Sequence, residues 1–353
     1  MRVLVTGGAG FVGANLSIAL AERHADWELV AFDNLRRRGS ELNIPRLREV
    51  GIAFAHGDIR EQADLEETGA PDAIIECSAE PSVMAGLDSG ADYVVKTNLL
   101  GAHHCLELAR RHNAQLVFLS TSRVYPVEAQ NAIRYAEAGT RFELEAEQPF
   151  DGVSPKGISE RFPLEGARTL YGATKLAAEL LITEYANAFG VRTVVDRCGV
   201  LAGPWQMGKV DQGIFTHWML SHYFSRDLTY LGYGGRGKQV RDLLAIEDLV
   251  DLVEDQLLHP DRWAGFVGNV GGGREVSLSL LETTELCREI TGNELSIGSD
   301  PQTRAGDVPI YLSDCDLLYG HTDWRPRRGP KEILESIHLW IKDNERAVER
   351  ALG

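Results

Sequence analysis

The first thirteen residues, MRVLVTGGAGFVG, constrain the fold of this chain more than any other stretch. Residues 2–6 are mainly apolar and β-branched, without a helical period, which predicts a short buried strand. Gly7, Gly10 and Gly13 follow at G-x-x-G-x-x-G spacing, and apolar residues at helical intervals begin at Phe11. A strand that turns through glycines into a helix directs backbone N–H groups and the positive helix end at one point. Such a point suits a pyrophosphate.

Asp33 makes this glycine pattern more specific, because tight turns of a purely structural kind use the same glycines. It ends the strand-like run 28–32 and lies twenty residues beyond Gly13. A carboxylate there would accept hydrogen bonds from the adenosine ribose and would favour NAD by repelling a 2′-phosphate, with Arg36–Arg38 leaving NADP as the alternative. The residues expected to contact the dinucleotide in this region are Gly7, Gly10, Phe11, Val12, Asp33 and Asn34.

Composition limits the classes of partner. The chain has 353 residues and a formal net charge of −16, which argues against nucleic acid or an anionic membrane as the main partner. Its five cysteines are scattered with no metal-binding or disulfide spacing, so we expect reduced thiols, no metal site and a cytoplasmic location. We also expect no signal peptide and no membrane span, because no apolar run is long enough.

Strand-like and helix-like stretches alternate through the first half of the chain. Further strands are predicted at 52–56, 73–77, 115–120 and 191–196, and helices at 100–112 and 172–189. This alternation predicts an α/β fold with a Rossmann-type, doubly wound parallel sheet. Ligands of such sheets bind at the carboxyl ends of the strands.

Three groups of residues fall at or near those strand ends. Asp58, followed by Ile59, could accept a hydrogen bond from an adenine amino group, or could equally cap a helix. Ser78 and Ala79 are small residues that would let backbone approach a cofactor, although an ordinary loop has the same composition. Asn98 could anchor backbone or water near the site from inside a helix.

The chemistry is predicted by two short runs, residues 119–125 (LSTSRVY) and 171–175 (YGATK). Tyr171 and Lys175, at positions i and i+4, share one helix face. A neighbouring ammonium stabilises phenolate and lowers the pKa of the tyrosine from its ordinary value of about 10. A hydroxyl at the end of the preceding strand could hold a substrate oxygen beside that phenol.

These motifs resemble those of the extended short-chain dehydrogenase/reductases of the NAD-dependent epimerase/dehydratase family, over essentially the whole chain. The matching pieces are residues 6–13, 32–35, 57–60, Asn98, 120–125, Tyr171 with Lys175, and 241–242. The resemblance implies that Tyr171 is the acid–base group and that Lys175 is its pKa partner and a ribose ligand. It implies that Thr121 orients the reacting sugar oxygen, with Ser122 as the alternative.

The chain departs from the family pattern at three places. Pro126 follows Val-Tyr where glycine is common, and Thr169-Leu170 precede the catalytic tyrosine where Ser-Pro is common. Dehydratases of the family place Asp-Glu directly after the catalytic threonine, whereas this chain has Ser122 and Arg123. This difference disfavours dehydration and favours epimerisation.

Within the family, the runs 32–40, 210–213 and 237–242 most resemble the 2-epimerases of CDP-hexoses. The alternatives are a 4-epimerase, a net sugar reductase, or a non-catalytic dinucleotide-sensing protein. The resemblance also implies a nucleotide-diphosphate sugar as substrate and a homodimer formed through the helices at 100–112 and 172–189.

The alternation of strand-like and helix-like stretches ends at about Cys198, which predicts a smaller C-terminal substrate-binding lobe. We expect residues 1–197, with about 236–262 returning, to form the NAD-binding domain, and 198–235 with 263–353 to form the lobe. Arg241 and Arg304 could bind a second diphosphate, and further substrate contacts are expected from Ser122, Arg123, Gln206 and Asp211. The segment 126–170 could line the sugar pocket or form a solvated excursion, and 330–352 is expected to be a closing amphipathic helix.

Overall fold

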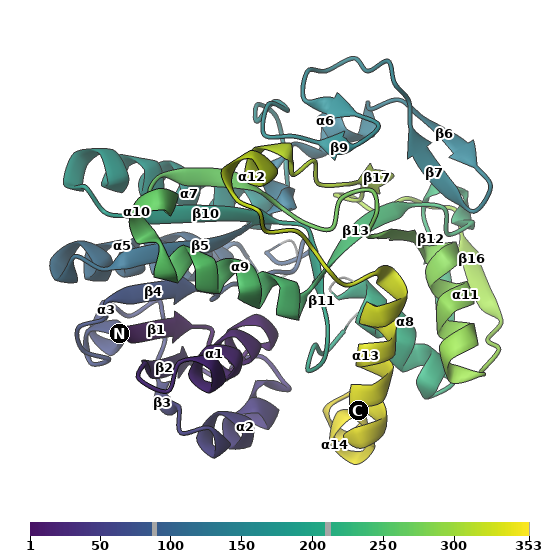
Figure 1. Cartoon of the computed structure of the whole chain (residues 1–353). Coiled ribbons are helices and arrows are strands. Elements are labelled where there is room, and N and C mark those ends of the chain that lie inside the picture. The colour runs from purple at the N-terminus through teal and green to yellow at the C-terminus, as the bar shows by residue number, and fades with distance from the viewer. Residues whose placement is uncertain (87–89, 209–212, 353) are drawn as a thin grey trace. The chain divides into compact units, whose positions relative to one another are not determined.

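The computed structural model describes residues 1–86, 90–208 and 213–352, which form two compact units (Figure 1). Unit 1 consists of Met1–Thr121, Leu170–Arg197 and Leu249–Val267. Unit 2 consists of Ser122–Thr169, Cys198–Asp248 and Gly268–Gly353. We describe each unit by itself.

A seven-stranded sheet has the order β14-β10-β5-β4-β1-β2-β3, and its strands belong to unit 1 except for Cys198 of β10 and the part of β14 from Gly268 on, which are counted with unit 2. The strands are β1 (Arg2–Thr6), β2 (Glu28–Asp33), β3 (Ala53–His56), β4 (Ala73–Glu76), β5 (Gln115–Thr121), β10 (Thr193–Cys198) and β14 (Phe266–Val270). The four pairings from β5 to β3 are parallel, which confirms the predicted Rossmann-type sheet. The strand order reverses between β1 and β4, and such a switch point is where sheets of this kind bind ligands.

The helical elements of unit 1 connect these strands. They are α1 (Phe11–Arg23), η1 (Ser40–Leu42), α2 (Asn43–Glu49), α3 (Gln62–Glu66), α4 (Asp92–Val95), η2 (Lys96–Leu100), α5 (Gly101–His112), α7 (Leu170–Phe189), α9 (Ile246–Leu258, from Leu249 on) and α10 (Pro260–Trp263). Both faces of β1 are buried, because Leu4 and its alternating neighbours Val3 and Val5 are at most 1% exposed.

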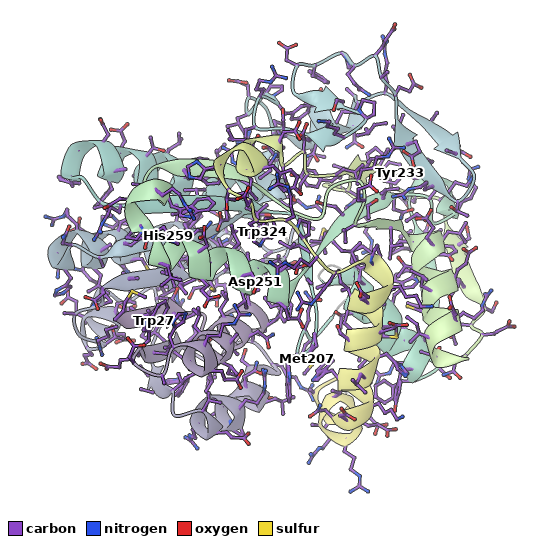
Figure 2. The ribbon with its side chains drawn as sticks, viewed as in Figure 1. Trp27, Met207, Tyr233, Asp251, His259 and Trp324 are labelled. Atoms are coloured by element: carbon purple, nitrogen blue, oxygen red, sulfur yellow. The ribbon has the colours of Figure 1, made fainter. Side chains whose placement is uncertain are left out.

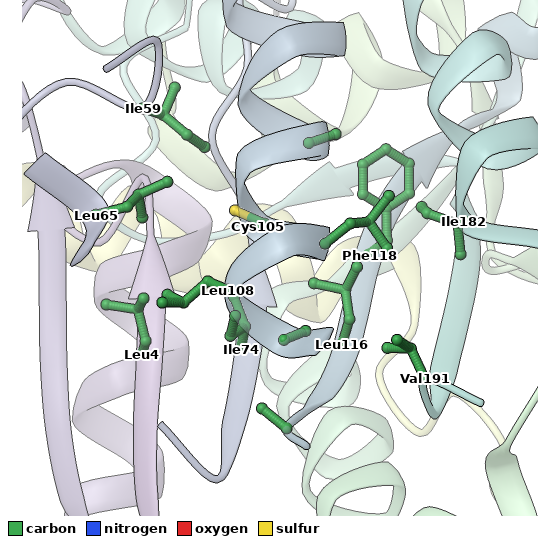
Figure 3. Close-up of a cluster of buried hydrophobic side chains, with 14 of the residues drawn as sticks. Leu4, Ile59, Leu65, Ile74, Cys105, Leu108, Leu116, Phe118, Ile182 and Val191 are labelled. Atoms are coloured by element: carbon green, nitrogen blue, oxygen red, sulfur yellow. The ribbon is translucent and has the colours of Figure 1, made fainter. Parts of the chain in front are cut away.

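One large apolar cluster holds this sheet against α5 and α7 (Figure 3). Leu4 of β1, Ile74 of β4, and Leu116 and Phe118 of β5 come from three strands and pack with Cys105 of α5. The centre of the Phe118 ring lies 3.7 Å from Nζ of Lys175, so this core contacts one of the predicted site residues directly.

Unit 2 is built from short strands and a group of three packed helices. Its strands are β6 (Tyr135–Ala138), β7 (Arg141–Leu144), β8 (Val153–Ser154), β9 (Gly157–Ile158), β11 (Val200–Ala202), β12 (Leu228–Leu231), β13 (Val240–Ala245), β15 (Ser277–Ser279), β16 (Ile297–Asp300) and β17 (Ile310–Tyr311). Its helices are η3 (Ser122–Val124), α6 (Val127–Asn131), α8 (Ile214–Tyr223), η4 (Tyr233–Gly235), α11 (Leu280–Thr291), α12 (Asp316–His321), α13 (Pro330–Asp343) and α14 (Glu345–Leu352). Helices α8, α11 and α13 pack on one another around buried residues such as Trp218 and Ile337.

The C-terminal stretch differs in part from the single closing helix that we expected. It forms two helices, because α13 ends at Asp343 and the chain leaves helical geometry at Asn344, where φ is −122°. Trp340 and Ile341 are buried in the core of unit 2, as expected.

The compact units also differ from the domain boundaries that we expected. Residues 122–169 belong to unit 2, and the returning segment of unit 1 is 249–267. The hairpin of β6 and β7 explains the first difference, because Phe142 N–H donates to the carbonyl of Lys238 (2.9 Å) and β7 contacts β15 and β17. Phe142 and Phe162 are buried, so this segment is a packed part of unit 2 and not a solvated excursion.

All five cysteines are free thiols, and four of them are buried. Within residues 1–86, 90–208 and 213–352, no helix combines the length and apolar character needed to cross a bilayer.

Candidate active site

The glycine turn after β1 brings two backbone segments into close contact. Gly7 has a φ of +63°, and a side chain there would put its Cβ 2.8 Å from the carbonyl oxygen of Cys77. A Cβ at Gly13 would lie 2.3 Å from the carbonyl oxygen of Gly7. The turn therefore has room for backbone only, and α1 starts directly behind it with its N–H groups at the carboxyl end of the sheet. This cradle fits the pyrophosphate of a dinucleotide, and Phe11 and Val12 form the first turn of α1.

The carboxylate of Asp33 ties the glycine turn to the end of β2. Its Oδ2 accepts from Ala9 N–H at 3.1 Å and its Oδ1 accepts from Leu35 N–H at 2.8 Å. Burial raises the pKa of Asp33, and these backbone donors oppose that rise. Leu35 itself adopts a left-handed φ of +54°, which is uncommon for a residue with a side chain. The structure thus places Asp33 at the carboxyl end of β2, beside the glycine turn.

A pocket at the ends of β2 and β3 adjoins this aspartate. It is lined by Asn34, Arg36, His56, Gly57, Asp58, Arg60 and Asp64. Asp58 accepts from Asn34 Nδ2 at 3.0 Å and from the Arg60 guanidinium at 2.7 Å. The Arg60 guanidinium holds the pKa of Asp58 well below its usual range. Asp58 does not cap α3, whose N-cap is Glu61.

Tyr93, which sequence reasoning missed, contacts two arginines that line this pocket. The guanidinium carbons of Arg36 and Arg60 lie 4.1 Å and 5.0 Å from the centre of its ring. Ile59 is buried and contacts Gly101 on α5. An Arg-Tyr-Arg stack of residues 36, 93 and 60 has no sequence signal, because these residues come from three separate loops and helices.

Asn98 anchors the loop after β4, where Ser78 and Ala79 lie. Its Oδ1 accepts from Glu80 N–H at 2.8 Å, and its Nδ2 donates to Glu80 O at 3.2 Å and to Thr174 Oγ1 at 3.1 Å. Asn98 lies in η2, a π-helical turn of the kind that is frequent at functional sites. The amide therefore links this loop to α7 between Tyr171 and Lys175.

Helix α7 carries the expected Tyr171 and Lys175 one turn apart. Thr121 ends β5 in the same unit and is 7% exposed. Lys175 is buried, with its Nζ 3.7 Å from the centre of the Phe118 ring and 3.2 Å from Oε2 of Glu76. The tyrosine, the lysine and the threonine hydroxyl all belong to unit 1.

A second buried ion pair fixes α7 one turn further on, at Glu179. Its carboxylate accepts a hydrogen bond from Arg197 Nη2 at 2.8 Å. It also accepts a hydrogen bond from the hydroxyl of Ser120, the neighbour of Thr121. Sequence reasoning missed Glu76, Glu179 and Arg197. Glu179 continues the i, i+4 row of Tyr171 and Lys175, which is a signal that could have found it.

The expected substrate residues that the structure describes belong to unit 2. Tyr233, labelled in Figure 2, belongs to the same unit. Arg241 Nη2 donates to Asp307 Oδ1 at 2.8 Å, and Arg123 Nη1 donates to Gly306 O at 3.1 Å. Tyr233 donates to Asn131 Oδ1 at 2.9 Å and experiences the charges of Asp307, Arg241 and Arg123. The two arginines therefore lie in one polar cluster.

The remaining predicted substrate residues have other surroundings. Gln206 donates to Leu201 O at 2.9 Å and accepts from Thr216 Oγ1 at 2.6 Å, which occupies both ends of its amide inside unit 2. Arg304 is exposed on a turn in which Asp307 N–H donates to its carbonyl. Ser122 begins η3 and is half-buried. Asp211 lies outside the described residues.

Known proteins are similar to this chain over nearly its whole length. The model of the NAD dependent epimerase/dehydratase family matches residues 3–271. The CDP-paratose 2-epimerase of Salmonella typhi is 30% identical over 354 residues, covering 96% of this chain and 99% of its own. A probable UDP-glucuronate 4-epimerase of Rhizobium meliloti (strain 1021) is 29% identical and covers 98% of both chains. The solved UDP-glucose 4-epimerase of Thermus thermophilus, a complex with NAD, has a TM-score of 0.76 and 25% identity, covering 97% of this chain and 99% of its own.

The glycine turn gives a direct test of cofactor binding. Gly7→Ala should weaken NAD binding about 10-fold or more, because a left-handed alanine costs about 1–2 kcal/mol before any clash with Cys77. Gly320→Ala is the matched control, since a Cβ there meets nothing within 4 Å. Calorimetric titration with NAD measures both variants. Wild-type affinity in Gly7→Ala would contradict the assignment of the turn.

Proposed function

The chain belongs to the NAD dependent epimerase/dehydratase family, and within it we propose a nucleotide-sugar epimerase that inverts one carbinol centre of a hexose. The observation that carries this proposal is the set of Tyr171, Lys175 and Thr121 in unit 1, with Tyr171 and Lys175 one turn apart on α7. The residues after Thr121 are Ser122 and Arg123, which offer no Asp-Glu pair for an elimination. That difference favours epimerisation over dehydration.

The proposed reaction assigns one task to each of these side chains. Thr121 holds the sugar oxygen by a hydrogen bond, and Tyr171, as phenolate, takes the proton of that hydroxyl. NAD, when bound, supplies the redox chemistry by accepting a hydride from the same carbon and giving it back. Tyr171 returns the proton after the keto-sugar has presented its other face. Because the reaction is redox-neutral overall, the enzyme consumes no external NAD(H).

Turning the sugar over requires a fixed anchor, for which we propose the diphosphate. Arg241 and Arg123 of unit 2 offer guanidinium groups, which suit phosphate oxygens. In the structure Arg241 pairs with Asp307, and its side chain is 13% exposed. A diphosphate bound by Arg241 would have to compete with this carboxylate, so we assign Asp307 to the same subsite.

We propose a CDP-hexose as substrate and C2 as the carbon that inverts, as in a CDP-paratose or CDP-tyvelose 2-epimerase. The similarity to the Salmonella typhi CDP-paratose 2-epimerase supports this choice. Inversion at C4 is the second candidate, because the similarity to a probable UDP-glucuronate 4-epimerase covers as much of the chain.

A substrate panel tests the reaction. CDP-, UDP-, GDP- and dTDP-hexoses are incubated with the enzyme, and the products are resolved by NMR. We expect C2 inversion of a CDP-hexose without added NAD(H), and Tyr171→Phe should lower the rate by about 10²–10⁴-fold because the proton acceptor is lost. Gly320→Ala, outside unit 1 and with open space around the added Cβ, is the control that should keep the wild-type rate. Inversion at C4 only would replace the C2 assignment, and sustained consumption of NADH would contradict an epimerase.

We further propose a homodimer formed through the helices at 100–112 and 172–189 of unit 1, which are α5 with the preceding Leu100 of η2, and α7. Leu180 and Phe189 on α7 are 64% and 56% exposed, and Leu100 of η2 is 36% exposed. Apolar side chains gathered on neighbouring helices favour burial against a second copy.

Sedimentation at micromolar concentration tests this proposal. We expect the wild type to sediment as a dimer and Leu180→Glu to sediment as a monomer, because a buried charge without a partner opposes association. Leu339→Glu, at a similarly exposed leucine of α13, should leave the dimer intact. A monomeric wild type would refute the proposal.

A further inference from the structure

A carboxylate that the reaction scheme leaves unused is buried next to the lysine of the site. Glu76 ends β4 and is 1% exposed, and its Oε2 lies 3.2 Å from Lys175 Nζ. Its Oε1 is buried and has no hydrogen-bond partner among the residues that the structure describes. The Phe118 ring, 3.7 Å from the same Nζ, offers only the weak attraction of an aromatic face to a cation. Glu76 is thus the anionic partner of the ammonium.

We propose that Glu76 is a positioning residue for Lys175, which fixes the ammonium at the end of β4 and offsets the charge that it exerts on Tyr171. The inference rests on the proposed function, because that function makes Tyr171 the acid–base group. It adds a third member to the Tyr171–Lys175 pair, one that no local sequence spacing connects to α7.

The surroundings of Glu76 leave Lys175 as its only charged neighbour among the described groups that act on it. Ser78 N–H of the following loop donates to the carboxylate, and the thiols of Cys77, directly after β4, and of Cys105 on α5 lie close by. Burial raises the pKa of both thiols well above the usual value, so neither carries charge at neutral pH. Burial also raises the pKa of Glu76, and Lys175 acts against that rise.

The sign of the effect follows from this pairing. A lone ammonium near a phenol stabilises phenolate and lowers the pKa of the tyrosine. A carboxylate in contact with that ammonium removes part of the field, so the phenol of Tyr171 keeps a higher pKa than the lysine alone would give it. Glu76→Gln keeps the shape and a carbonyl acceptor for Nζ but removes the negative charge, and the pKa of Tyr171 should therefore fall.

The experiment is a spectroscopic titration of phenolate in the purified enzyme with its bound cofactor, with the signal of Tyr171→Phe subtracted. In Glu76→Gln we expect the pKa of Tyr171 to fall by about one pH unit, and the acidic limb of the rate profile to move to lower pH with it. Asp196→Asn is the control, because it removes another buried carboxyl of the same sheet, bonded to Gln256. It should leave the titration at the wild-type value.

A second pair of variants tests whether the shift acts through Lys175. In a Lys175→Met background, Glu76 has lost its partner and burial keeps it neutral, so adding Glu76→Gln should leave the pKa of Tyr171 unchanged. An equal shift with and without Lys175, or no shift in Glu76→Gln alone, would overturn the inference. The titration needs no substrate, so the two proposals can fail separately. If the wild type epimerises none of the sugars, the proposed function is wrong. The shift in the pKa of Tyr171 still shows whether Glu76 acts on Lys175.

Discussion

The close contact between the glycine turn and the end of β4 is the constraint on which the rest of unit 1 depends. Gly7 meets the backbone of Cys77 at a distance that leaves no room for a side chain. This contact lies at the point where the strand order reverses between β1 and β4. It places the N-terminus of α1, the carboxylate of Asp33 and the loop after β4 around one edge of the sheet, which is the arrangement that a dinucleotide requires.

Three buried polar links then fix α7 against that edge. Asn98 reaches Thr174 from η2, Glu76 reaches Lys175 from β4, and Glu179 joins α7 to Ser120 and Arg197. Each link leaves a costly unpaired group if its partner is lost, because burial removes the alternative of hydrogen bonding to water. Tyr171 and Lys175 therefore lie on a helix whose position is set from four neighbouring elements, η2, β4, β5 and β10, which limits how far Tyr171 can move relative to Thr121.

Much of unit 1 could be predicted from the sequence because its signals are local. The run Arg2–Thr6 is a strand with those bounds, and the i, i+4 spacing of Tyr171 and Lys175 holds on α7. The position of 122–169 could not be predicted, because it depends on long-range interactions: the hydrogen bond from Phe142 N–H to Lys238 O and the contacts of β7 with β15. The ion pair of Glu76 with Lys175 could not be predicted for a related reason. The apolar run around Glu76 indicates a strand, but it does not indicate which charged residue Glu76 contacts.

The proposed function joins these observations into one claim: the same carbon of the sugar gives up a hydride and receives it back while Tyr171 moves the proton. The most direct measurement uses a CDP-hexose that carries deuterium at C2, converted in ordinary water and analysed by NMR and mass spectrometry. The account predicts that the epimerised product keeps its deuterium at C2. Replacement of that deuterium by hydrogen from water would contradict the account, because inversion would then proceed by exchange of a proton at carbon.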